Sequence, residues 1–81
     1  MSATRLSARA VAQMVRIGQG WAPRRRGRVT VIHQVHRANR NVEAYLEGDD
    51  PRVPHTRFVL SFGELGSKYR LLDDTRTEGA A

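Results

Sequence analysis

The residues best suited to chemistry in this sequence are its arginines, which gather in the first half of the chain. Nine arginines and no acidic residue occupy positions 1–42, whereas all eight carboxylates lie between Glu43 and Glu78. Guanidinium groups bind phosphate through paired hydrogen bonds and attract polyanions over about 8–10 Å in physiological salt. The densest cluster is Arg24–Arg28, in which four of five residues are arginine. This segregation of charge favours a polyanionic partner, and nucleic acid is the first to consider.

Two alternative causes of the arginine excess stay open. Arg outnumbers Lys 13 to 1, a choice that GC-rich coding alone can favour, although it does not explain the absence of acids from positions 1–42. The arginine-rich, acid-free N-terminus also has the look of an organelle transit peptide, which would leave only a short mature protein.

Two basic clusters and one aromatic residue are the candidate nucleic-acid contacts. An exposed loop after Pro23 would supply phosphate contacts, and a stacked base on Trp21 or Tyr45 would complete a platform for single strands or RNA. The alternative for Trp21 is that it packs in the core, as a lone Trp in a small barrel often does. Tyr45 lies between two outward-facing glutamates, which argues against contact between Tyr45 and phosphate. The clusters lie about 25–30 Å apart along an extended strand, so the sheet must curve to bring them onto one face. The candidates are Trp21, Arg24, Arg25, Arg26, Arg28, Arg37 and Arg40.

No pattern in the sequence predicts catalysis or a metal site. His33 and His36 are three residues apart, which places them on opposite faces of a strand, and there is no cysteine. The serines lack the Gly-x-Ser-x-Gly context of a nucleophile, and adjacent aspartates point apart. We therefore expect a non-enzyme without a cofactor or a metal.

An amphipathic helix is predicted near the N-terminus, where residues 1–14 form a basic segment. Apolar residues recur at helical spacing, and arginines lie off that stripe. The helix either packs on the core with solvated arginines or presents them to phosphate. A cap is expected at Thr4 or Ser7, and an end at Gly18. The stripe is Leu6, Ala10, Met14 and Ile17, widened by Val11 and Val15, with Arg5, Arg9 and Arg16 beside it.

Residues 15–72 are predicted to form a small, mainly β barrel of four to five strands. Alternation of side-chain type predicts strands over Arg28–His36, 42–47, Arg57–Phe62 and Lys68–Leu72, with Trp21 in or beside a first strand. Phe58, Leu60 and Phe62 are expected in the core.

Three connecting segments and the C-terminus complete the prediction. The stretch 37–41 is expected to turn through an asparagine, which tolerates left-handed backbone geometry. Residues 63–66 are expected to form a single 3₁₀ turn, because they are too few for an α-helix. Residues 73–81 lack apolar anchors and are predicted to be a disordered tail.

This order of a hairpin, a long loop, a third strand, a 3₁₀ turn and a closing strand resembles SH3-like small barrels. The stretch Val15–Trp21 and the closing Lys68–Leu72 also look like small proteins of actinobacteria and their phages, which open with Gly-Gln-x-Trp and close with Tyr-Arg-Leu. That group lends no established function. Among SH3-like barrels, KOW and Tudor-type relatives bind RNA, DNA, ribosomal or polymerase surfaces, while others bind peptides, so the fold does not choose between these partners.

Two functions are carried forward from the sequence. The first is a non-catalytic, nucleic-acid-binding barrel whose arginine-rich loop contacts the phosphates of DNA or RNA. Its expected setting is transcription, or phage or plasmid biology. The alternative is a protein-interaction or assembly subunit, or a homo-oligomer, that uses Leu6, Met14 and Ile17 and its segregated charge. No run of 18 apolar residues predicts a membrane span. The expected location is the cytoplasm, or the virion for a phage structural protein.

Overall fold

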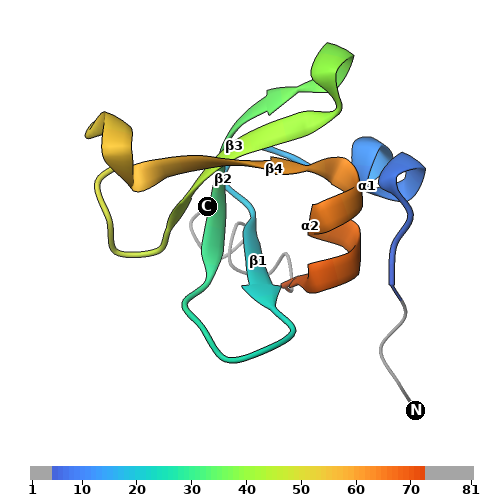
Figure 1. The fold of residues 1–81 in the computed structure, drawn as a ribbon, viewed down its shortest axis with the longest axis horizontal. Helices are drawn as coiled ribbons and strands as arrows, with labels where there is room; N and C mark the ends of the chain where they lie inside the picture. The colour runs from blue at the N-terminus through green and yellow to red at the C-terminus, as the bar shows by residue number, and fades with distance from the viewer. Residues whose placement is uncertain (1–4, 73–81) are drawn as a thin grey trace, which may run out of the picture.

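Five strands form one antiparallel sheet in the computed structural model, which describes residues 5–72 (Figure 1). Their order is β4-β3-β2-β1-β5, so a four-strand meander is followed by a fifth strand that returns to β1. The predicted mainly β fold is confirmed. The strands are β1 (Gly20–Pro23), β2 (Thr30–His36), β3 (Asn41–Leu46), β4 (Arg57–Ser61) and β5 (Tyr69–Leu71).

Two short helices lie side by side next to the sheet, as Figure 1 shows. They are α1 (Ala8–Met14) and α2 (Phe62–Lys68), and single 3₁₀ turns, η1 (Arg37–Asn39) and η2 (Pro54–Thr56), lie in the connections. The segment that precedes α1 contacts α2 where the Leu6 amide donates to the Gly66 carbonyl at 3.1 Å. Gly66 is required there, because a Cβ atom would lie 2.2 Å from the Leu6 carbonyl oxygen.

The predicted N-terminal helix is confirmed, but its buried side differs from the predicted stripe. Ser7 caps the helix by accepting a hydrogen bond from the Ala10 amide. Val11 and Val15 are fully buried, whereas Ile17 is 64% exposed. The helix ends at Met14, before Gly18, so helical spacing no longer applies at Ile17. The N-terminal residues 1–4 of this segment lie outside the described part of the chain.

The prediction of a 3₁₀ turn over residues 63–66 is wrong, because α2 is an α-helix of seven residues. Ser61 caps it by accepting a hydrogen bond from the Glu64 amide at 3.0 Å, with the Ser-x-x-Glu spacing of a capping box. Phe62 and Leu65 are buried on its inner side. Burial of these two side chains outweighs the cost of two helical glycines, about 1 kcal/mol each.

A bulge in β2 changes which of its side chains face the core. The register shifts between Ile32 and Gln34, so Ile32 lies opposite Ala44 and Val35 lies opposite Val42. Ala44 and Val42 are both buried. The side chains of β2 that face the core therefore have even residue numbers before the bulge, as at Ile32, and odd numbers after it, as at Val35. Simple alternation along 28–36 does not reveal this change.

The turn between β2 and β3 is confirmed, but Arg40 rather than an asparagine adopts the left-handed conformation, with a φ of 56°. The carbonyl of Arg40 accepts the Phe62 amide at 2.9 Å. This bond connects the turn to the start of α2 and helps to hold a backbone conformation that costs a residue other than glycine about 1–3 kcal/mol.

The core fills the space between one face of the sheet and the helix pair. Trp21 and Phe62 are its largest side chains, and Leu60 is also buried in it. Phe58 is half-buried against the same cluster. The predicted tail at 73–81 lies outside the described residues. The remaining members of the cluster are Val11, Val15, Ile32, Val42 and Leu65.

Candidate nucleic-acid interface

Two surface hollows border the helix pair, and each is lined by several cations and, among the described residues, by no carboxylate. The loop hollow has a volume of about 580 Å³, and the turn hollow about 410 Å³. The loop hollow is lined by Arg5, Pro23, Arg24, Arg25, Ser67, Lys68 and Tyr69. The turn hollow is lined by Ala8, Arg9, Ala12, Arg37, Arg40 and Phe62.

Residues 5–9, which lead into α1, contribute one arginine to each hollow. The β1–β2 loop and η1 lie at opposite ends of β2, and α1 and α2 lie beside the sheet between them (Figure 1). Arg5 lines one hollow and Arg9 the other. Four residues span at most about 14 Å, so Arg5 and Arg9 lie within that distance of each other, whereas the β1–β2 loop and η1 stay at opposite ends of β2. Residues 5–9 thus connect the loop hollow with the turn hollow.

Arg24 and Arg37 each hold the end of a helix. The Arg24 Nε donates to the Ser67 carbonyl at 3.1 Å in the last turn of α2. The Arg37 guanidinium donates to the carbonyls of Ala12 and Val15 at the end of α1. Carbonyls in a last helical turn lack helical partners, and a cation there also complements the helix dipole. Both arginine side chains therefore support the fold as well as contributing positive charge.

Arg28 is separated from the other arginines of the loop run. Its two terminal nitrogens contact the Asp49 carboxylate at 3.2 and 3.4 Å, and one of them also lies 3.4 Å from the Glu47 carbonyl oxygen. This two-pronged ion pair offsets its charge. Arg28 therefore belongs to the acidic β3–β4 connection and lines neither hollow.

Arg25 and Arg26 remain the most available cations of the run. Both are exposed and make no hydrogen bond or ion pair within residues 5–72. Arg25 lines the loop hollow, whereas Arg26 is its neighbour in the chain and does not. Arg40 is also exposed and lines the turn hollow.

The aromatic residues lie differently from the sequence prediction. Trp21 is fully buried, and its Nε1 donates to the Gln19 side chain at 3.2 Å, so of the two sequence alternatives its ring packs in the core and is not placed to stack on a base. The Tyr45 ring meets His33 edge to face at 6.0 Å, away from both hollows. Tyr69 lines the loop hollow, and the sequence did not single it out.

Sequence reasoning also missed the positions that join the clusters. Lys68 lines the loop hollow and pairs with Glu64 at 3.7 Å through exposed side chains. Arg5 and Arg9 were placed beside the apolar stripe, with phosphate contact as one of two alternatives, but they were not among the candidate nucleic-acid contacts. Their position off that stripe was the available signal, because it places them outside the core.

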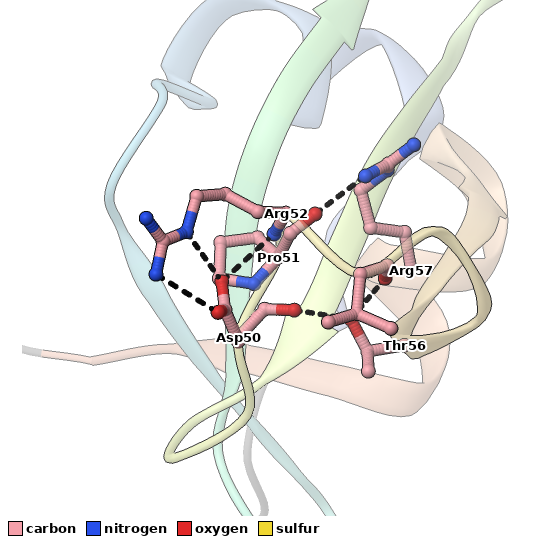
Figure 2. A network of polar contacts seen from close by, with 6 residues as sticks. Asp50, Pro51, Arg52, Thr56 and Arg57 are labelled. Atoms are coloured by element: carbon pink, nitrogen blue, oxygen red, sulfur yellow. Dashed lines mark hydrogen bonds and ion pairs between the residues drawn. The ribbon is translucent and has the colours of Figure 1, made fainter.

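The acidic β3–β4 connection lies on the other side of the molecule from α1 and α2 (Figure 1). Figure 2 shows the Asp50 carboxylate facing the Arg52 guanidinium and backbone amide, with the Asp50 carbonyl accepting the Thr56 hydroxyl. The Arg52 side chain, and then its amide, hold the pKa of Asp50 below its usual value of 3.8. Arg57 pairs with Glu43 at 3.4 Å. Glu43, Asp50 and their partner arginines thus line neither hollow, whereas Glu64 pairs with Lys68 of the loop hollow.

The three candidate protein-interaction residues have different surroundings. Leu6 and Met14 are half-buried and pack against the core, whereas Ile17 is 64% exposed. Val59 is also exposed, at 61%, and lies on β4 at an edge of the sheet.

In the part of the chain that the structure describes, no group of three His, Cys, Asp or Glu side chains is placed to hold a metal ion. No helix among those residues is long and apolar enough to cross a membrane. Comparison with protein-family models, with curated proteins and with solved structures found no match.

Proposed function

We propose that this protein is a non-catalytic, nucleic-acid-binding small barrel that contacts phosphates through the basic face formed by the two hollows. The observation that carries the proposal is the lining of the hollows: four cations in one and three in the other, joined through Arg5 and Arg9. Contacts from arginine and lysine to phosphate provide affinity without base specificity. DNA and RNA are both suitable partners, because they share this phosphate backbone.

The experiment is fluorescence anisotropy of labelled DNA and RNA at salt concentrations from about 50 to 200 mM. We expect micromolar or tighter binding that weakens steeply with salt. Arg25→Ala should weaken binding about equally for all sequences and reduce the slope of log K against log salt by about 0.7–0.9. Arg9→Ala, in the turn hollow, should weaken binding and reduce the salt slope by the same amounts.

Arg52→Ala is the matched control, because it also removes one positive charge from an exposed side chain. Arg52 lies in the β3–β4 connection, away from both hollows, so this change should leave the slope unaltered. Equal losses in Arg25→Ala and Arg52→Ala would mean that net charge alone drives binding. Absence of binding at the lowest salt concentration would refute the proposed nucleic-acid binding.

The exposed Ile17 and Val59 support a second candidate, a protein-interaction or assembly subunit. An edge strand such as β4 offers unpaired backbone groups to another chain. In that case the mass measured by sedimentation should rise with concentration, and Ile17→Asp or Val59→Lys should prevent the rise. A constant monomer mass would exclude self-assembly.

A further inference from the structure

We infer that the loop hollow takes an unstacked base of a single-stranded nucleic acid, with Tyr69 as the stacking surface and Arg5 and Arg25 as phosphate contacts. This inference rests on the proposed function and narrows it from nucleic acid in general to single strands. It also assigns a binding role to Tyr69.

The size of the loop hollow favours a flexible strand. Its volume of about 580 Å³ lies within the range of about 300–1,000 Å³ that small-molecule ligands occupy. A nucleotide with its base turned outward is a ligand of that class. A duplex keeps its base faces stacked inside and presents phosphates on a convex surface, so it would leave the interior of the hollow empty.

Tyr69 is held in place for stacking. It is the first residue of β5, lies opposite Pro23 of β1, and its amide donates to the Leu65 carbonyl at the end of α2. The half-buried side chain packs against the core and also lines the hollow. A ring fixed in this way loses little conformational freedom when a base stacks on it.

The cations around Tyr69 come from three separate segments. Arg5 precedes α1, Arg24 and Arg25 lie in the β1–β2 loop, and Lys68 ends α2. Arg24 is held by its bond to Ser67, and Lys68 shares its charge with Glu64. Arg5 and Arg25 make no such contact within the described residues, so they are the free phosphate contacts of this site.

The turn hollow extends the path of the strand. A stacked single strand carries one phosphate per about 3.4 Å, so the maximum separation of about 14 Å between Arg5 and Arg9 corresponds to about four nucleotides. A short strand that leaves the loop hollow along α1 therefore reaches Arg9 and Arg40.

The test compares three labelled probes of equal length at one salt concentration: an oligothymidylate, its duplex with oligodeoxyadenylate, and an abasic strand. The parent protein should bind the oligothymidylate about tenfold more tightly than the abasic strand, which corresponds to the loss of one stacked base. The duplex should bind less tightly than the intact single strand.

Variants then assign the preference to Tyr69. Tyr69→Leu should bind the oligothymidylate about tenfold more weakly than the parent protein does and should bind the abasic strand with the parent affinity. The slope of log K against log salt should stay unchanged. Tyr69→Phe should retain the parent affinity, and Tyr45→Leu is the control for loss of a tyrosine elsewhere.

The abasic probe needs no variant, so it remains decisive if Tyr69→Leu fails to fold. Equal binding of all three probes by the parent protein would overturn the single-strand inference and leave the proposed function intact. Failure of every probe to bind would overturn the proposed function itself.

Discussion

Replacement of Gly66 by alanine tests the close contact between α1 and α2, on which both hollows depend. The added Cβ would lie 2.2 Å from the Leu6 carbonyl oxygen and 3.0 Å from Val11 Cγ2. Because the nearest atom belongs to the backbone, α1 must move away. Overpacking costs about 1–3 kcal/mol, and the lost Leu6–Gly66 hydrogen bond adds about 0.5–1.5 kcal/mol. The higher helix propensity of alanine relative to glycine offsets about 0.8–1 kcal/mol of this loss.

The net expectation for Gly66→Ala is a loss of about 1–3 kcal/mol in the free energy of unfolding. In a domain of this size, each 1 kcal/mol lowers the melting temperature by about 4–8 °C. The assay is thermal and urea unfolding followed by circular dichroism. Nucleic-acid binding should weaken as well, since α1 carries Arg9 and follows Arg5.

Gly63→Ala is the matched control in the same helix. A Cβ at Gly63 would meet only the Ser61 hydroxyl oxygen, at 4.0 Å. This variant should therefore be as stable as the parent or gain up to about 1 kcal/mol. If Gly66→Ala stabilised the protein as much as Gly63→Ala, the close packing of α1 on α2 would be refuted.

Two further predictions concern the acidic connection and the core. The Asp50 carboxyl should titrate with a pKa below 3.8 in a carbon-detected NMR experiment, and Arg52→Ala should move the titration midpoint back toward pH 3.8. An unmoved midpoint would show that Arg52 does not lower this pKa. Because the pKa is lowered in the folded state, the stability that Asp50 contributes is present above about pH 3.8 and is lost as the pH falls through the lowered value. Trp21 fluorescence should be blue-shifted, resist iodide quenching and stay constant when nucleic acid binds, whereas strong quenching by a bound strand would mean that Trp21 meets a base.

The parts of the fold that depend on neighbouring residues were predicted well. Side-chain alternation located the strands after the first, and Ser7 was among the predicted caps of α1. Local patterns carry this information because strand alternation and helix capping involve residues only two or three positions apart.

The errors arose where tertiary contacts overrule local preference. Residues 63–66 alone are too few for an α-helix, but the helix extends over Phe62–Lys68, and burial of Phe62 and Leu65 against α1 and the sheet stabilises it. The bulge in β2 interrupts the simple alternation on which the strand prediction relied, because it changes the core side from Ile32 to Val35 opposite Ala44 and Val42 of β3. Neither effect is visible in the segment itself.

By itself, the sequence determined the segregation of charge and the mainly β architecture, because both follow from the order of residue types along the chain. Only the tertiary structure decided which arginines are available. Arg24, Arg28 and Arg37 are bound to groups 43, 21 and 25 positions away, respectively. Such contacts depend on where the chain folds back on itself, and a run of identical arginines contains no sign of which will find a partner.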